Sequence, residues 1–350
     1  MIPCLYCGEK KPKDGFNREH VIPQAFGLFR QNFVLKIVCR DCNSYFGNNL
    51  DNVLSRDSME GVQRFESGLQ TPTPKHRLGR GKRVKPTLRG QYEGALLEWV
   101  QPQDGSPGLV IQPLPQIGVA KDKAGPFTWY TLHEMPTLAE LRESGIGKEF
   151  WLRPWNCTEE EARQVLREKG FSDEIAFEPP EEGVVFEPYS AAEISVSGVI
   201  DDITARAIAK IAFNYLAFHF PGVARSAACE SIRRFIRYGG DNWRKHVRVT
   251  NERMVKNVPE NVQLYVHLVA ATWERNPGRL IGQVSLFNWV HYKVLLGTTF
   301  LVQPEFVRMG HSFDPANNVI MPLTTKAQKL IDLSQHIEFK RGDPIKPRKD

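Results

Sequence analysis

The chain has 350 residues, a net charge of +6 at neutral pH and a hydrophobic content of 41%. These values are typical of a folded protein with two or three domains, and they exclude a fibrous or wholly disordered chain. No signal peptide is recognisable, and the most apolar segment, 205–220, is interrupted by Arg206 and Lys210 and is too short to cross a membrane. We therefore expect a cytoplasmic protein.

Charge is unevenly distributed along the chain. Basic residues exceed acidic ones in 1–90 and 191–350, whereas acidic residues dominate 91–190. Two basic ends favour contact with a polyanion, and nucleic acid is the partner that such a pattern most often serves. Ordinary variation of surface charge is the alternative.

Two Cys-x-x-Cys pairs lie near the N-terminus, formed by Cys4, Cys7, Cys39 and Cys42. In a long cytoplasmic chain such pairs indicate metal ligands rather than disulfides. Four thiolates complete the tetrahedral shell of a zinc ion, so we predict a structural zinc site. The isolated Cys157 and Cys229 are expected to be unreactive.

The segment between and after these pairs has a simple predicted order. A short strand over 18–22 ends at Pro23, and a second strand over 33–38 leads into the second cysteine pair. Apolar residues spaced by three or four predict a helix over 41–54, and a further helix is expected over 58–67. The order is therefore knuckle, strand, loop, strand, helix.

Three polar residues in this segment are candidates for chemistry. Glu19 and His20 are adjacent on the first strand, and Asn43 directly follows the last cysteine. Histidine is a suitable general base at neutral pH, and carboxylate or amide oxygens are suitable ligands for a hard divalent cation. Neighbours in a regular strand point to opposite faces, so Glu19 and His20 could serve one site only if the strand is distorted.

These motifs resemble the HNH endonucleases of the ββα-metal, or His-Me finger, fold, in the branch that carries a four-cysteine zinc. The resemblance covers residues 4–55 and rests on Cys4-Leu-Tyr-Cys7, Glu19-His20-Val-Ile-Pro23 and Cys39-Arg-Asp-Cys42-Asn43. It implies a treble-clef-like module in which His20 activates water. It also implies that Glu19 and Asn43 hold a catalytic Mg²⁺ or Mn²⁺.

Two features depart from the family pattern. The acid before the histidine is Glu19, where much of the family has Asp. The helix also offers other oxygen ligands, namely Asn48, Asn49, Asp51 and Asn52. Asp51 or Asn52 is therefore an alternative metal ligand, and Asn43 would then brace a loop.

Residues 71–90 are predicted to be a basic linker. Pro72, Pro74 and Pro86 are expected to break regular structure there. We predict contact with a phosphate backbone through the basic side chains, and a merely solvated linker is the alternative. These side chains are Lys75, Arg77, Arg80, Lys82, Arg83, Lys85 and Arg89.

The remainder divides into an acidic mixed region over 91–184 and a C-terminal domain over 185–350. In the acidic region, short strands are expected over 95–100, 109–112, 127–133 and 150–153, with helices over 137–144 and 158–169. The second helix begins with the capping-box pattern of Thr158 and Glu161.

In the C-terminal domain, the apolar run 203–220 predicts a buried helix, and 230–238 a shorter one. Three strand-like runs follow and predict an antiparallel meander, over 262–272, 280–289 and 291–302. A late helix is expected over 326–333. Arg233, Arg234 and Arg237 form either a solvated helix face or a phosphate clamp.

The expected fold class is α+β, with an HNH module over 1–70 and a C-terminal domain that recognises substrate or partner. The expected function is metal-dependent cleavage of DNA, compatible with restriction or antiviral defence. The alternatives are a catalytically inactive, zinc-stabilised nucleic-acid-binding module and a nuclease that acts on RNA.

Overall fold

The protein is a mixed α+β chain that divides into two compact units. A computed structural model describes residues 1–29, 33–67, 84–88, 92–100, 110–122, 125–172, 177, 194–240, 242–250, 252–255 and 265–323. The first unit combines Met1–His76 with Ile200–Asp350, and the second is Arg77–Val199. The structure thus joins the two ends of the chain in one unit, whereas the sequence suggested consecutive segments. The functional division into four segments stays a prediction.

The N-terminal segment has the order of elements expected from the sequence. Two short strands, β1 (Ile2–Pro3) and β2 (Lys10–Lys11), pair around the first cysteine pair. The hairpin of β3 (Phe16–His20) and β4 (Val34–Cys39) leads directly into helix α1 (Arg40–Phe46). The helical path then continues through a π-helical turn η3 (Gly47–Asp51), α2 (Asn52–Arg56) and α3 (Met59–Glu66). The predicted strand, loop, strand and helix are confirmed within a few residues.

Pairing between β3 and β4 is irregular next to the Glu-His pair. Asn17 pairs with Val38 and Glu19 with Leu35, so that Arg18 of β3 faces two residues of β4, Lys36 and Ile37. The extra residue, and hence the bulge, lies in β4. The irregularity lies where a distortion was expected, but a bend of β3 itself at Glu19 and His20 stays a prediction.

A long helix, α6 (Asp202–His219), begins the C-terminal half of the first unit. The side chain of Asp201 caps it by accepting a hydrogen bond of 3.0 Å from the backbone N–H of Thr204. Every residue from Thr204 to Ala217 is buried, as the apolar run predicted. Two shorter helices follow, α7 (Pro221–Arg225) and α8 (Glu230–Tyr238).

A six-stranded antiparallel sheet completes the first unit, in the order β12-β15-β14-β13-β16-β17. Its strands are β12 (Val247–Thr250), β13 (His267–Glu274), β14 (Arg279–Ser285), β15 (His291–Thr298), β16 (Arg308–Asp314) and β17 (Val319–Pro322). The predicted meander of three strands is confirmed as β13, β14 and β15. Strands β12, β16 and β17 were not predicted, and the late helix expected over 326–333 lies outside the described residues.

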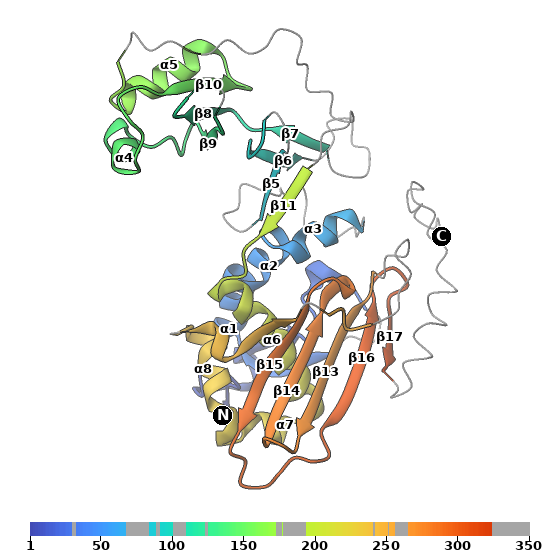
Figure 1. Ribbon diagram of the computed structural model, residues 1–350. Helices are drawn as coiled ribbons and strands as arrows, with labels where there is room; N and C mark the ends of the chain where they lie inside the picture. Colours follow the sequence, from blue (N-terminus) through green and yellow to red (C-terminus); the bar gives the residue numbers. More distant parts are fainter. Residues whose placement is uncertain are drawn as a thin grey trace. The chain divides into compact units, whose positions relative to one another are not determined.

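Helix α6 lies between the sheet and the N-terminal segment (Figure 1). One side packs on β13, β14 and β15, and another contacts β4, η3 and α2. The approach to the sheet is close, because a Cβ atom added to Gly282 would lie 2.8 Å from the Cβ of Ala212. The helix is thus held by the sheet on one side and offers its other side to the N-terminal segment.

The described residues of the second unit form three small sheets and two helices. The strands are β5 (Val84–Leu88) paired with β11 (Ile194–Gly198), β6 (Leu97–Val100) with β7 (Val110–Pro113), and β8 (Gln116–Ala120) with both β9 (Thr128–Thr131) and β10 (Trp151–Trp155). Helices α4 (Leu138–Glu143) and α5 (Glu159–Glu168) both begin with a capping box, at Thr137 and Thr158. The box predicted at Thr158 is confirmed.

One expectation about the linker is wrong. Pro86 does not break regular structure, because it lies inside β5 and pairs with Val196 of β11. In a two-stranded sheet each strand has an unpaired edge, so a proline can sit where no ladder hydrogen bond is required of it. Residues 84–88 are therefore part of a folded unit.

Candidate active site

The four paired cysteines converge on one point. Their Sγ atoms all lie within 4.8 Å of one another, and those of Cys7 and Cys39 are 3.8 Å apart. A tetrahedron with Zn–S bonds of about 2.3 Å has edges of about 3.8 Å, so this spacing fits a zinc ion. All four are free thiols, and the cluster supports a structural zinc site.

Local structure explains how the cysteines are positioned. The first pair sits on a turn closed by a 3.1 Å bond from the N–H of Gly8 to the carbonyl of Cys4, with φ of +73° at Gly8. Cys39 precedes helix α1, and its N–H points to the Sγ of Cys4 at 3.4 Å. Hydrogen bonds from Cys42 and from backbone amides lower the pKa of Cys4 to about 4, despite its burial. A low pKa suits a thiolate ligand.

Glu19 points inward, away from solvent, and meets two side chains of α6. Its Oε1 accepts hydrogen bonds from Lys210 Nζ at 2.6 Å and from Asn214 Nδ2 at 2.9 Å. The same Nζ lies 2.9 Å from Oδ2 of Asp51. Glu19 is only 3% exposed and Lys210 is 0% exposed. One ammonium group therefore joins two carboxylates that come from separate parts of the N-terminal segment.

Asn214 connects this ion network to the cysteine cluster. Its Oδ1 accepts a 2.6 Å hydrogen bond from the hydroxyl of Tyr6, which lies between Cys4 and Cys7. Its Nδ2 donates to Glu19 and also, at 3.2 Å, to the carbonyl of His20. The amide is fully buried and satisfied at both ends, so it fixes β3 relative to the zinc knuckle.

Asp51 lies at the end of the π-helical turn η3, a feature that often marks functional sites. Burial raises the pKa of its carboxyl to about 6, although the Lys210 ammonium opposes the shift. Burial alone would lower the pKa of Lys210, but the charges of Asp51 and Glu19 outweigh it and raise that pKa above its ordinary value. The Oδ1 of Asp51 is buried and has no hydrogen-bond partner among the described residues.

His20 is half-buried at the end of β3. Burial lowers the pKa of its imidazole below the ordinary value, and the positive charges of Arg18 and Lys210 lower it further. A lowered pKa keeps the ring neutral at pH 7, so that one nitrogen can accept a proton. Its Nε2 lies 3.4 Å from Nε2 of Gln24, which is the one side-chain partner given for the ring in the described structure.

Asn43 takes up a bracing position in this structure. Its Nδ2 donates a 3.2 Å hydrogen bond to the carbonyl of Arg18, the residue of β3 that faces the bulge in β4. The amide thereby ties α1 to β3. Asn49, another predicted alternative, donates to the carbonyl of Tyr45 within the helix. The role of Asn43 as a metal ligand stays a prediction.

The oxygen atoms of the site are of the kind that binds a hard divalent cation. The carboxylates of Glu19 and Asp51 both lie within hydrogen-bonding distance of Lys210 Nζ, and Oδ1 of Asp51 is buried and unused. Magnesium and manganese prefer such oxygen ligands and complete their shells with water. Within the described residues, no third His, Cys, Asp or Glu forms a possible metal-ligand group with Glu19 and Asp51. Glu19 and Asp51 would thus hold the ion, with Lys210 as a competing charge.

Comparison with known families gives a match in the N-terminal segment. Residues 4–59 match the family model described as HNH endonuclease. Comparison with curated proteins found no match, and neither did comparison with solved structures. The match spans both cysteine pairs, Glu19, His20, Asn43 and Asp51, and we call residues 4–59 the HNH segment below.

Three residues of α6 that touch the HNH segment were not among the predicted site residues. Arg206, Lys210 and Asn214 occur at intervals of four, which places them on one face of the helix. Arg206 donates a 2.7 Å hydrogen bond to the hydroxyl of Tyr45, and the other two reach Glu19. The sequence signal was three polar residues spaced by four within an otherwise apolar helix.

Two of the three arginines of α8, Arg233 and Arg237, have structural partners. Arg237 lies over the ring of Tyr45 at 4.2 Å and hydrogen-bonds to the thiol of Cys42, while Arg233 donates to the carbonyl of Ala224 at 2.7 Å. These contacts favour a structural role for both over a phosphate clamp. The predicted nucleic-acid contacts Lys75, Arg77, Arg80, Lys82, Arg83 and Arg89 lie outside the described residues, and Lys85 lies in β5.

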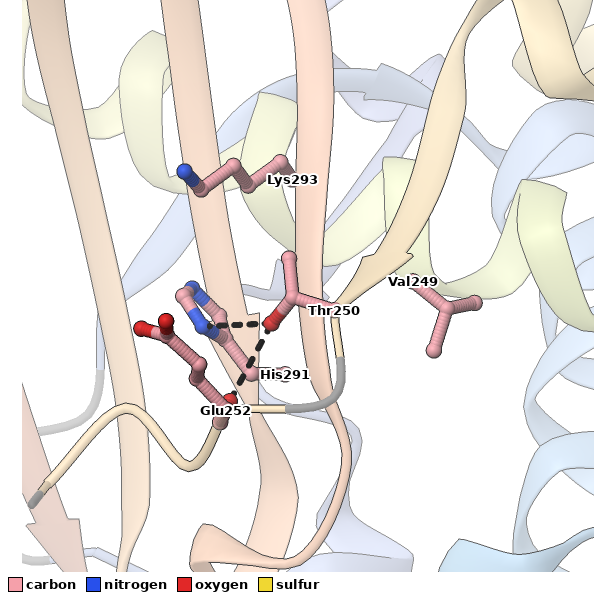
Figure 2. Close-up of a pocket in the computed structure, with 5 residues that line it drawn as sticks. All are labelled: Val249, Thr250, Glu252, His291 and Lys293. Carbon is pink, nitrogen blue, oxygen red and sulfur yellow. Dashed lines mark hydrogen bonds between the residues drawn. The ribbon is translucent and has the colours of Figure 1, made fainter.

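A separate open pocket of about 400 Å³ lies at the β12 edge of the large sheet (Figure 2). In it, the hydroxyl of Thr250 bonds to Nδ1 of His291 at 3.0 Å and to the carbonyl of Glu252 at 3.1 Å. Val249 and Lys293 complete its lining. None of the predicted site residues lines this pocket, so it is distinct from the HNH segment. Among the described residues, no helix is long and apolar enough to span a membrane.

Proposed function

We propose that this protein is an HNH endonuclease that hydrolyses phosphodiester bonds of DNA. The observation that carries the proposal is the convergence of Glu19 and Asp51 inside the segment that matches the HNH family, which also contains His20. The hairpin followed by a helix, anchored by four cysteines, supports the ββα-metal, treble-clef-like arrangement. The basic ends of the chain support a polyanionic substrate.

His20 is the general base in this proposal. A neutral imidazole takes a proton from water while the water oxygen attacks phosphorus, and the bond to the 3′ oxygen breaks. The leaving oxygen then takes up a proton, which yields a 5′-phosphate and a 3′-hydroxyl end. A divalent ion held by Glu19 and Asp51, either Mg²⁺ or Mn²⁺, supplies charge neutralisation at the phosphate and the leaving oxygen when bound.

The second candidate is an inactive, zinc-stabilised nucleic-acid-binding module. The observation that favours it is the ammonium of Lys210, which already neutralises Glu19 inside a nearly solvent-free environment. In that case the ion network would serve only to attach the HNH segment to α6. Binding of DNA without cleavage under any metal condition would identify this module.

A nicking assay separates the two candidates. Supercoiled plasmid is incubated with wild type, His20→Ala and His133→Ala, in zinc-retaining buffer with Mg²⁺, with Mn²⁺ or with neither. His133 is an exposed histidine of the second unit and controls for the loss of an imidazole. We expect His20→Ala to reduce cleavage by about 10²–10⁴-fold and His133→Ala to leave it unchanged.

Zinc content and folding of each variant are measured in parallel, so that loss of activity is not confused with loss of the knuckle. Equal cleavage by wild type and His20→Ala would contradict the assignment of the base. Comparing single- and double-stranded DNA with RNA determines the substrate class. A phage-plating assay with wild type and His20→Ala tests the proposed role in restriction or antiviral defence.

A further inference from the structure

Lys210 has an environment that is unusual for lysine. It is 0% exposed, and its ammonium group has both Glu19 and Asp51 as partners, at 2.6 Å and 2.9 Å. Lysine is almost never fully buried unless it is paired, because a buried charge without a partner is costly. The two carboxylates belong to β3 and η3, and the lysine to a helix about 160 positions later in the chain. A contact this distant in sequence has to be built by the tertiary fold.

The ammonium is bonded to the carboxylate oxygens that a divalent ion held by Glu19 and Asp51 would need. A metal ion held by both carboxylates would bind the oxygens at about 2.0–2.1 Å and would retain several waters. Those oxygens now accept hydrogen bonds from Lys210, and Glu19 is closed to solvent. Two cations cannot share the same oxygens without strong repulsion.

The helix that carries Lys210 cannot easily withdraw as a whole. The close approach of Ala212 to Gly282 fixes α6 on the sheet, and Arg206 and Asn214 bind the HNH segment on either side of the lysine. The flexible part is the four-carbon stem of the lysine itself. The ammonium group thus belongs to the C-terminal half of the first unit, and the rigid helix α6 holds it against the HNH segment.

We propose that Lys210 is the resident cation of the Glu19–Asp51 pair and competes with a divalent ion for its oxygens. This inference rests on the metal site of the proposed function, and it assigns a regulatory part of that site to α6. The lysine keeps the carboxylates together in the metal-free protein and weakens their affinity for the ion. Removing its charge should therefore strengthen metal binding.

The test measures Mn²⁺ binding without nucleic acid, by calorimetric titration and by the metal-dependent shift in melting temperature. Zinc-loaded wild type is compared with Lys210→Met, which keeps the length of the side chain and removes its charge. Arg206→Met is the matched control, because Arg206 lies one turn earlier on the same face and bonds to neither carboxylate. We expect Lys210→Met to bind Mn²⁺ at least tenfold more tightly than wild type, and Arg206→Met to match wild type.

Lys210→Met leaves two carboxylates close together, so it is expected to melt at a lower temperature than wild type and to recover in Mn²⁺. A variant that stays unfolded with saturating Mn²⁺ as well as without it would overturn the proposal, because the ion should replace the lost charge. Equal Mn²⁺ affinity in wild type and Lys210→Met would also overturn it. The double variant Lys210→Met/Glu19→Gln is expected to fold and to lose the gain in affinity.

The outcome is independent of whether the protein cuts DNA, because binding is measured without substrate. Failure to cleave DNA with a normal competition result would reject the proposed function alone. Cleavage in metal-free buffer by wild type but not by Lys210→Met would reject the competition, because the ammonium would then serve as the only cation of the site.

Discussion

Asn214 is the residue through which the zinc knuckle and the candidate site are coupled. Its amide oxygen accepts from Tyr6 in the knuckle, and its amide nitrogen donates to Glu19 and to the backbone of His20. Because every polar atom of this amide is used, its orientation determines where Glu19 lies. A side chain outside the HNH segment thus orients two of the residues assigned to catalysis.

This coupling predicts the effect of Tyr6→Phe. The change removes one hydroxyl from a fully buried environment and leaves Oδ1 of Asn214 without its donor. We expect a loss of about 1–3 kcal/mol in the free energy of unfolding, measured by urea denaturation with zinc bound. Tyr238→Phe, at an exposed tyrosine of the same unit, is expected to change stability little. A Tyr6→Phe variant as stable as wild type would show that the 2.6 Å bond is not important to the network.

The cysteine cluster could be predicted from residue types and spacing alone. The roles of Glu19, His20 and Asn43, with Asp51 as an alternative ligand, come from the family resemblance and stay predictions. The partner of Glu19 could not be identified in that way, because Lys210 is 191 positions away and nothing local links the two. Only the spacing of three polar residues within an apolar helix indicated that this face meets something polar.

At the scale of elements, α6 determines the architecture of the first unit. Its sequence predicted a buried helix, and its length and burial agree with that prediction. The close packing on β14 depends on two small residues, Ala212 on the helix and Gly282 on the strand. The distance between helix and sheet in turn sets how far Lys210 reaches toward the HNH segment.

Gly282→Ala is expected to destabilise the protein by about 1–3 kcal/mol, because the added Cβ would meet Ala212 at 2.8 Å and Leu296 at 3.1 Å. Gly222→Ala is the control, since a Cβ on Gly222 of α7 has no neighbour within 4 Å. Thermal and urea unfolding measure both variants. The Ala212→Gly change should recover part of the loss in Gly282→Ala. Independent, additive effects of the two changes would contradict the proposed contact.

Predicted and observed elements differ where a strand is defined by its pairing with a strand that is distant in the sequence. Helices α6 and α8 were predicted almost to the residue because the pattern of their apolar residues is a local signal. Strands β16 and β17 were missed, since they are defined by pairing at the far edge of the sheet. Pro86 was misjudged for the same reason: its strand exists only because β11, more than a hundred residues later, pairs with it.

At the scale of the whole first unit, His267 links the HNH segment to the sheet. Its Nε2 lies 2.7 Å from the carbonyl of Phe26, and its Nδ1 accepts a 3.2 Å hydrogen bond from the N–H of Phe287. The ring must therefore be neutral and carry its proton on Nε2. Burial lowers the pKa of His267 to about 4, only partly opposed by the bond to Phe26.

A pH dependence of stability follows from this arrangement. The unfolded chain binds a proton at His267 with a pKa of about 6.5, while the folded protein resists protonation until about pH 4. More protons are bound in the unfolded state between these values, so stability falls as the pH falls through this window. From pH 7.5 to 5 we expect His267 to contribute a loss of about 2 kcal/mol.

Urea unfolding of wild type and His267→Gln at both pH values checks this expectation. Glutamine does not titrate in this range, so the variant should lose about 2 kcal/mol less than wild type over the same pH interval. Other histidines and the cysteine cluster respond equally in both proteins and cancel in the comparison. Identical pH profiles would show that the histidine does not stabilise the junction in its neutral form.

The second unit is inserted in the sequence between the two halves of the first unit, so the two halves are synthesised at different times. The HNH segment leaves the ribosome first, and Lys210 follows Asp51 by 159 positions. At about 5–20 residues per second, translation separates them by roughly 10–30 s. A nascent chain in that interval has its cysteines, His20 and both carboxylates, but lacks the helix that unites them. Activity that depends on the assembled network would therefore begin only after α6 has been synthesised.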